Sequence, residues 1–313
     1  MDAGLAPLVV IGGPTATGKT GLAIDLAERL HARGIPAEIV SADSRQVYVG
    51  MDIGTAKATA GERARVVHHG IDLVAPDVAY SVADFRAHAL GALRGLGERG
   101  GVGILAGGTG LWLRAVFAGI DTGALPHDPQ VRAEVEEVLA AEGVEAASAR
   151  LAALAPSLAA RTDPRNPRRV ARALELAILR GDRPLPEAAG YGSPVLGVQL
   201  VVAPGEHARR IHARARAQFA AGLVDEARGL RERYDPSLPA FTSIGYRESW
   251  AYLDGECTLE DAIEADALRN VQFAKRQRTW FRREPALEVV DATTGAGPDL
   301  AGRLESWLGE LRA

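Results

Sequence analysis

Short apolar runs alternate with longer amphipathic segments along most of the chain. The run Leu8–Ile11 is followed by apolar residues at helical spacing from Leu22 to Leu30, which predicts a strand and then a helix. Further strands are expected at Ala37–Val40, Ile71–Val74, Val102–Leu105 and Leu196–Val202. Strands that alternate with helices are typical of an α/β fold, in which helices flank a parallel sheet.

The strand pattern is absent between residues 121 and 194. Apolar stripes of helical spacing that include Val131, Leu151 and Val170 replace it. We therefore expect a mostly helical insertion at 121–194, inside a core formed by 1–120 and 195–313. In this core, helices are expected to start after Ser81, near Gly205, at Leu259 and at Pro298.

The turn after the first strand has the spacing GxxxxGK[ST], from Gly13 to Thr20. Glycines let backbone N–H groups converge on an anion, and the start of the next helix adds partial positive charge. Lys19 can reach an outer phosphate, and the Thr20 hydroxyl can bind Mg²⁺. The pattern favours a polyphosphate site, without distinguishing a nucleoside triphosphate from another diphosphate. The residues expected to bind it are Gly13, Pro14, Thr15, Ala16, Thr17, Gly18, Lys19 and Thr20.

An acidic residue, Asp43, follows the second strand, at the edge where open parallel sheets bind their ligands. The strand Val102–Leu105 instead leads into glycines and Thr109. Motor and signalling NTPases carry a Mg²⁺-binding acid at a strand end of this kind. The arrangement therefore suits an acceptor base in a small-molecule transferase better than a motor. A purely local role, in which Asp43 and Ser44 cap the next turn, stays open.

Arginines concentrate in three places. Residues 161–183 hold seven arginines against three acids, a local charge of +4, and no acid occurs between Asp266 and Arg283. Such segments are either solvated helix faces or surfaces for nucleic-acid phosphates. Arg210 and Arg214 lie four apart on one helix face, where they can clamp a diphosphate or pair with an acid such as Glu206.

The composition is that of an ordinary globular protein, with 313 residues, 47% hydrophobic and 24% charged, and a net charge of −4. Cys257 is the only cysteine, which excludes a disulfide framework and a cysteine-based metal cluster. The adjacent His68 and His69, placed at a helix end, are interpreted as structural. The sequence has no apolar run long enough to span a bilayer and no secretory signal, so we expect a cytoplasmic protein without a membrane partner. We also expect it to be a monomer.

Seven motifs in consistent order resemble the tRNA dimethylallyltransferase family, also called tRNA isopentenyltransferases. They extend from near Leu8 to about Arg283, nearly the whole chain. Trp112 departs from the tyrosine usual in the family, and the lack of a C-terminal zinc finger indicates a bacterial form. The motifs are GPTATGKT at 13–20, SADSRQVYVGMDIGTAK at 41–57, YSVADF at 80–85, GGTGLWLRA at 107–115, NPRRVARALE at 166–175, SIGYRE at 243–248 and KRQRTWFR at 275–282.

The resemblance implies a P-loop NTPase-like fold and transfer of a dimethylallyl group from dimethylallyl diphosphate to N6 of adenosine 37, next to the tRNA anticodon. It implies that Lys19, Mg²⁺ at Thr20 and the pair Arg210 and Arg214 stabilise the leaving diphosphate, while Asp43 removes the amine proton. Thr109 is a further catalytic candidate. The residues expected to contact the anticodon stem-loop are Asp43, Ser44, Arg45, Gln46, Thr109, Arg132, Arg168, Arg169, Arg172, Ile244, Gly245, Tyr246, Arg247, Lys275, Arg276, Arg278 and Arg282.

Three other functions compete with this interpretation. A P-loop small-molecule kinase shares the loop but leaves the basic segments without a purpose. An adenylate isopentenyltransferase acting on free nucleotides shares the loop and Asp43 but has no need of the helical insertion. A P-loop RNA-binding switch without chemistry does not explain Asp43.

Overall fold

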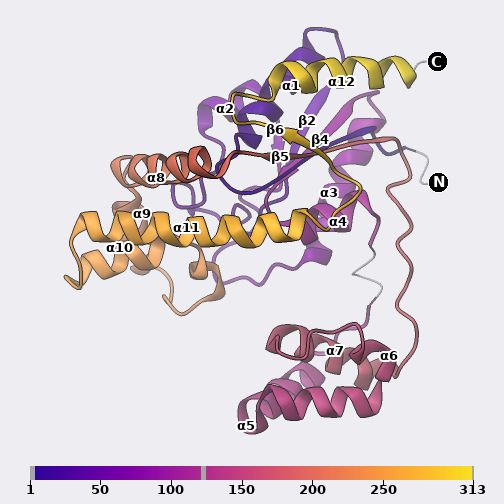
Figure 1. The fold of residues 1–313 in the computed structure, drawn as a ribbon, viewed down its shortest axis with the longest axis vertical. Coiled ribbons are helices and arrows are strands. Elements are labelled where there is room, and N and C mark those ends of the chain that lie inside the picture. The colour runs from indigo at the N-terminus through magenta and orange to yellow at the C-terminus, as the bar shows by residue number, and fades with distance from the viewer. Residues whose placement is uncertain (1–3, 121–124, 312–313) are drawn as a thin grey trace. The chain divides into compact units, whose positions relative to one another are not determined.

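The computed structural model describes residues 4–120 and 125–311, which belong to two compact units. One unit contains residues 1–119 and 190–313, and the other contains residues 120–189. The sequence placed the insertion at 121–194, so the observed unit ends five residues earlier than expected. Figure 1 shows the sheet and most helices in the first unit and helices α5, α6 and α7 in the second.

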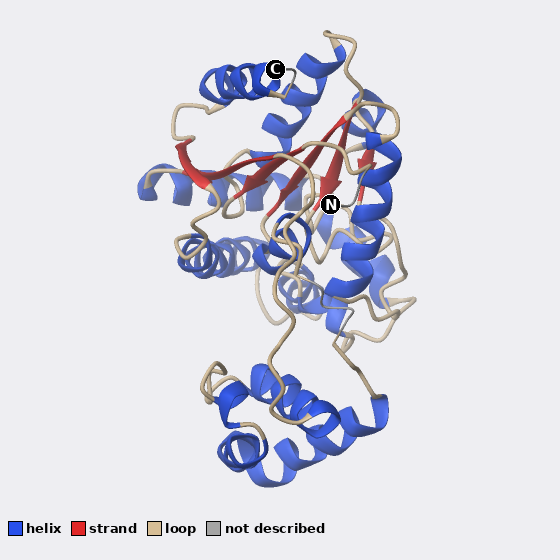
Figure 2. Ribbon diagram, turned by 90° about the vertical axis from the view of Figure 1, so that its right-hand side faces the viewer, coloured by secondary structure: helices blue, strands red, loops and turns tan. Residues whose placement is uncertain are grey.

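Six parallel strands form one sheet in the first unit, in the order β3-β2-β4-β1-β5-β6. The α/β class and parallel sheet predicted from the apolar runs are confirmed, and Figure 2 shows the strands with helices on both sides. The strands are β1 Leu8–Gly12, β2 Ala37–Ser41, β3 His68–His69, β4 Val102–Gly107, β5 Val195–Val201 and β6 Glu288–Asp291.

Helices cover both faces of the sheet because its central strands are buried on both sides. On β1, Leu8 and Val10 pack into one apolar core with Phe85, whereas Val9 and Ile11 pack into another with residues of two further helices. This alternation follows from the two-residue period of a strand. The helices of these two layers are α1 Lys19–His31, α3 Val82–Gly97, α4 Gly110–Phe117 and α12 Gly297–Glu310.

A second group of helices follows β5 and packs against itself. The longest of them, α11, lies against α8 and α10 and also contacts α4 (Figure 1). This packing brings the motif KRQRTWFR, near the end of α11, close to the turns that follow the central strands. The elements are α8 Pro204–Ala220, α9 Leu223–Arg231, the 3₁₀ helix Pro239–Thr242, α10 Tyr246–Leu253 and α11 Leu259–Phe281, and a short helix α2 spans Ala60–Arg65 in the first half of the chain.

The second unit is helical, as the apolar stripes predicted. Its helices are α5 Pro129–Leu154, α6 Pro156–Ala159 and α7 Pro167–Arg180. The expected apolar stripes that include Val131 and Leu151 both lie in helix α5. This helix is kinked at Gly143, whose φ of 83° breaks the helical backbone. Val135, Leu151 and Val170 form part of the core.

Both edge strands of the described sheet differ from the expectation, since β6 was not predicted and β3 lies at another position. The third strand is His68–His69 instead of Ile71–Val74, so the placement of these histidines at a helix end was wrong. Asp72 has a φ of 53°, which turns the chain, and Val74 forms only an isolated bridge with Tyr48. His69 lies 2.7 Å from Glu38, and the described residues hold no group of three or more His, Cys, Asp or Glu side chains placed for a metal ion. Among the helices of the described residues, none is both long and apolar enough to cross a membrane.

Candidate active site

The turns after β1, β2 and β4 meet at one edge of the sheet. The register pairs Gly12 with Gly107 and Ser41 with Ala106, so the three strands end side by side. A cavity of about 310 Å³ lies beyond these ends, at the edge where open parallel sheets bind ligands. Its lining includes Thr15, Ala16, Gly18, Lys19, Thr20, Asp43, Gln46, Gly108, Arg214, Phe273 and Gln277.

The loop after β1 has the shape that its glycines predict. Gly13 and Gly18 have φ angles of 140° and 90°, and Ala16 has a φ of 60°. A side chain at Gly13 would also approach the Leu200 carbonyl oxygen at 2.7 Å. Gly18 then caps α1, so the positive end of this helix opens at the cavity. The loop is therefore built to receive an anion.

Lys19 points back at its own loop. Its Nζ donates a hydrogen bond to the Pro14 carbonyl at 2.5 Å, and Thr17 Oγ1 donates to the same oxygen at 2.9 Å. Burial lowers the pKa of Lys19 to about 7; Arg214 acts in the same direction, and the Asp43 carboxylate partly opposes it. The charged and neutral forms of Lys19 are therefore both populated near neutral pH.

This lowered pKa predicts that a diphosphate binds together with a proton. A bound anion favours the charged ammonium, so above pH 7 the protein should take up protons on binding, and affinity should fall as the pH rises. Calorimetric titration with pyrophosphate at pH 8, in buffers of different ionisation enthalpy, measures this uptake. Lys19→Arg is the matched control, since arginine stays charged. Equal proton uptake by both proteins would contradict the assignment to Lys19.

Asp43 both caps a turn and lines the cavity. Its Oδ1 accepts a hydrogen bond from the Arg45 N–H at 2.9 Å, which is the local role considered above. The Ser44 N–H donates to Thr109 Oγ1 at 3.1 Å, so Thr109 ties the loop after β4 to the loop that carries Asp43. One carboxylate oxygen is thus engaged by the backbone while the side chain remains at the cavity wall.

Arg210 and Arg214, both on α8, have different surroundings. Arg214 lines the cavity and donates to Asn270 Oδ1 at 3.1 Å. Arg210 instead pairs with Glu206 at 2.7 Å and donates to the Thr293 carbonyl at 2.7 Å. Arg210 is thus held by the neighbouring acid and a backbone carbonyl and is not among the residues that line the cavity. Binding of one diphosphate by both arginines stays a prediction.

Several residues expected along RNA are held inside the first unit. Arg45 donates to the Pro239 carbonyl and to Thr242 Oγ1, both at 2.9 Å. Gln46 lines the cavity, but its amide accepts from Ser41 and donates to the Thr55 carbonyl. These side chains shape the loop after β2, and their contact with RNA stays a prediction.

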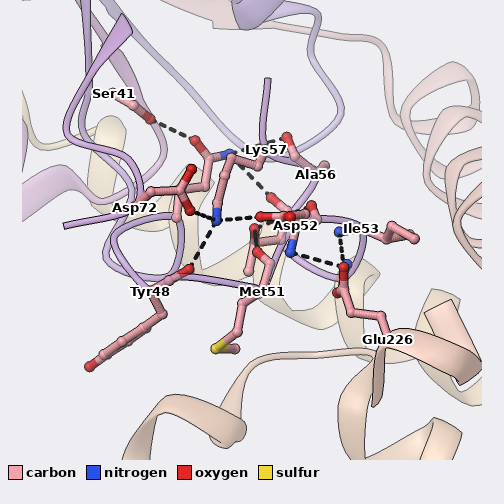
Figure 3. A network of polar contacts seen from close by, with 12 residues as sticks. Ser41, Tyr48, Met51, Asp52, Ile53, Ala56, Lys57, Asp72 and Glu226 are labelled. Atoms are coloured by element: carbon pink, nitrogen blue, oxygen red, sulfur yellow. Dashed lines mark hydrogen bonds and ion pairs between the residues drawn. The ribbon is translucent and has the colours of Figure 1, made fainter. Parts of the chain in front are cut away.

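The motif SIGYRE also turns inward. Tyr246 is fully buried, and its hydroxyl donates to Glu226 at 2.8 Å. Glu226 in turn accepts from the backbone N–H groups of Asp52, Ile53 and Gly54 (Figure 3). Gly245 is buried as well, with a φ of 106°. Of this segment, the exposed Arg247 and half-buried Ile244 are the residues open to solvent in this conformation, and contact of the segment with RNA stays a prediction.

Lys57, one of only three lysines in the chain, is buried at the centre of a polar network. Its ammonium lies 2.6 Å from Asp52 and 2.5 Å from Asp72 and donates to the Tyr48 carbonyl at 2.9 Å (Figure 3). In the sequence, Lys57 lies in the motif at 41–57, but no role was predicted for this residue. A compact ammonium with three donors suits three oxygens around one point, so this lysine fixes the loop that follows Asp43.

The end of α11 presents a basic surface beside the loop after β1. Lys275, Arg276 and Arg282 are exposed and Arg278 is half-buried. A second cavity, of about 360 Å³, is lined by Pro14, Lys275, Arg278, Thr279 and Arg282, among other residues. Lys275, Arg278 and Arg282, three and four residues apart on α11, thus form one cationic groove next to the loop between Gly13 and Thr20.

The arginines of the second unit fall into two groups. Arg168 and Arg169 are exposed. Arg172 and Arg132 instead surround Glu175, which is fully buried, at 2.9 and 3.7 Å, and His127 Nδ1 lies 2.6 Å from the same carboxylate. Burial alone would raise the pKa of Glu175, but the hydrogen bonds from Arg172 and His127 outweigh it and hold the pKa below its usual value.

Arg172→Ala should therefore destabilise the second unit by about 2 kcal/mol, because a buried carboxylate loses its closest guanidinium partner. Arg168→Ala, on the exposed face of the same helix, should change stability by less than about 0.5 kcal/mol. Hydrogen exchange of α7 amides measures the difference. Because the pKa of Glu175 is lowered, its contribution is present at neutral pH and is lost as the pH falls through that pKa. Equal protection in the two variants would contradict this role.

The cavity fits a magnesium ion that arrives with a diphosphate. Mg²⁺ usually takes one or two protein oxygen ligands together with phosphate oxygens and water. Thr20 and Asp43 line the same cavity and provide a hydroxyl and a carboxylate. The residues present therefore suit a magnesium ion that phosphate oxygens also bind, and not an ion bound by protein ligands alone.

Comparison with known proteins gives a consistent result. Residues 46–284 match the family model described as IPP transferase. A tRNA dimethylallyltransferase of Anaeromyxobacter sp. (strain K) is 47% identical over 281 residues, 88% of this chain and 90% of that protein. One from Thioalkalivibrio sulfidiphilus is 42% identical over 98% of this chain and 97% of its own length.

Solved structures agree in fold. The full-length tRNA isopentenylpyrophosphate transferase from Bacillus halodurans superposes with a TM-score of 0.70 at 37% identity, covering 97% of this chain and 96% of that one. A eukaryotic dimethylallyltransferase acting on tRNA gives a TM-score of 0.74 at 25% identity, covering 92% of this chain and 74% of that one.

Proposed function

Because the chain belongs to the IPP transferase family, whose relatives are named tRNA dimethylallyltransferases, we propose that it prenylates an adenosine of tRNA. The donor is dimethylallyl diphosphate and the acceptor atom is N6 of adenosine 37, in the anticodon stem-loop. The observation that carries this proposal is a single cavity that joins an anion loop, Arg214 and Asp43.

The anion loop and two cations serve the donor. A diphosphate in the loop between Gly13 and Thr20 meets backbone N–H groups and the start of α1. Lys19 and Arg214 line the same cavity, so both cations can stabilise the negative charge that grows on the diphosphate as the carbon–oxygen bond breaks. A magnesium ion held by Thr20 would supply further charge stabilisation to the departing diphosphate.

Asp43 serves the acceptor. The exocyclic amine of adenine is a weak nucleophile because its lone pair is delocalised into the ring. Removing its proton as the carbon–nitrogen bond forms makes the attack easier, and the Asp43 carboxylate lies in the donor cavity where this proton has to leave. A loop base must first leave its stack to enter such a cavity.

The basic surfaces serve the RNA. Lys275, Arg276, Arg278 and Arg282 on α11 and the exposed Arg168 and Arg169 on α7 provide cations for RNA phosphates. A small-molecule kinase or an enzyme for free adenine nucleotides has no use for such surfaces. A binding switch without chemistry leaves Asp43 and Arg214 unexplained. We further propose that the protein acts as a monomer in the cytoplasm, where tRNA is available.

Incubation with radiolabelled dimethylallyl diphosphate and Mg²⁺ tests the proposal directly. Label should enter unmodified tRNA and an anticodon stem-loop RNA, and it should not enter AMP. Transfer to AMP at a comparable rate would favour the nucleotide enzyme. ATP hydrolysis at a comparable rate would favour the kinase, and binding of tRNA without transfer would favour the switch.

A further inference from the structure

A buried glutamine of α11 holds the tip of the anion loop. Gln277 Oε1 accepts a hydrogen bond from the Thr15 N–H at 2.8 Å, and Gln277 Nε2 donates to the Gly108 carbonyl at 3.0 Å. The side chain is 7% exposed and lines the donor cavity. One amide thus joins the loop after β1 to the loop after β4.

The orientation of this amide follows from its partners. A backbone N–H only donates and a carbonyl only accepts, so Oε1 must face Thr15 and Nε2 must face Gly108. A leucine, an alanine or a carboxylate at this position could not make both bonds. The fit is also close in space, since a Cβ on Gly108 would lie 2.4 Å from Gln277 Nε2.

The carbonyl group of the same residue, Thr15, is held by a second side chain. His207 Nε2, on α8, lies 2.7 Å from the Thr15 carbonyl oxygen, so this nitrogen carries the ring proton. His207 is 2% exposed. Burial lowers the pKa of His207 despite this hydrogen bond, and Arg278 and Lys19 add to the effect. A neutral histidine and a neutral glutamine therefore fix Thr15 without adding charge to the cavity.

We propose that Gln277 is a positioning residue that holds the anion loop in the shape that binds the donor diphosphate. The Thr15 N–H is used for this attachment, which leaves the amides that follow it and Lys19 to face the anion. The role rests on the proposed function only for the identity of the donor, since any diphosphate in this loop would depend on the same attachment.

The test compares Gln277→Ala with Gln272→Ala, an exposed glutamine of the same helix. Gln277→Ala should raise the Kd for Mg²⁺-pyrophosphate and the KM for dimethylallyl diphosphate about tenfold, the loss expected for two hydrogen bonds at a buried site. Affinity for tRNA should stay within about twofold of wild type. Gln272→Ala should change neither quantity.

A second variant separates positioning from a general loss of stability. Gly108→Ala should displace the Gln277 amide by direct overlap and weaken pyrophosphate binding in the same way. Once Gln277 is alanine the overlap is gone, so the double variant should bind like Gln277→Ala alone. Unchanged pyrophosphate affinity in Gln277→Ala, or equal weakening for both substrates with a lower Tm, would overturn the proposal. Pyrophosphate binding does not depend on prenyl transfer. If the protein failed to modify tRNA, the proposed function would be refuted, and the pyrophosphate affinities of these variants would still test the role of Gln277.

Discussion

Asp43→Ala is expected to lower the rate of prenyl transfer by about two to four orders of magnitude, the usual scale for the loss of a general base. The carboxylate lines the donor cavity together with Lys19 and Arg214. Affinity for tRNA should persist, because phosphate contacts supply most of it. Single-turnover transfer of labelled donor, with tRNA and donor both saturating, measures the chemical step.

Asp43→Asn distinguishes the base from the turn cap. Asparagine caps turns as well as aspartate does, so it should keep the hydrogen bond from the Arg45 N–H while losing the ability to take a proton. If Asp43 is the base, the asparagine variant is as slow as the alanine variant. Recovery of normal turnover by Asp43→Asn would show that the residue matters only for the turn, and the exposed Asp77→Ala provides a control without effect.

The central strands and the anion loop could be predicted because their signals are local. Continuous apolar runs marked β1, β2 and β4, and the residues that follow them necessarily meet at the same edge. The edge strands β3 and β6 were missed, since two to four residues carry too little apolar pattern to separate them from loops. Asp72 contributed to the wrong assignment of a strand at Ile71–Val74. Its positive φ turns the chain inside a stretch whose apolar residues are typical of a strand.

Tertiary partners decided the residues whose roles changed. Arg210 and Arg214 look equivalent in the sequence, yet only one of them has Glu206 four residues before it. In the sequence, Glu175 is one of three acids near seven arginines and has no special feature. In the structure it is buried, and Arg132 and Arg172 both pair with it. Gln277 contacts a residue 262 positions away, and no local pattern reports a partner at that separation.

The exposed arginines of the second unit are expected to make tRNA binding steeply dependent on salt. Each phosphate contact releases counterions, so a surface with about six contacts loses roughly a thousandfold in affinity between about 50 and 200 mM salt. The net charge of −4 does not oppose this, because the excess of positive charge at residues 161–183 is local. Pyrophosphate binding in the enclosed loop should depend on salt much less.

The structure divides these arginines into exposed side chains and side chains paired with Glu175, which sharpens the experiment. Changing the exposed Arg165, Arg168 and Arg169 together to alanine should flatten the slope of log affinity against log salt by roughly one unit per lost contact. The rate at saturating tRNA should change little, since phosphate contacts position the RNA without taking part in chemistry.

Arg150→Ala is the matched control, because Arg150 belongs to the same unit and pairs with Glu142 at 2.5 Å. Its loss should leave the slope unchanged. Titrations of each variant with an anticodon stem-loop RNA at several salt concentrations decide between the two groups. A slope that stays at the wild-type value in the triple variant would mean that these side chains form a solvated helix face, and the RNA-binding cations would then have to be sought on α11.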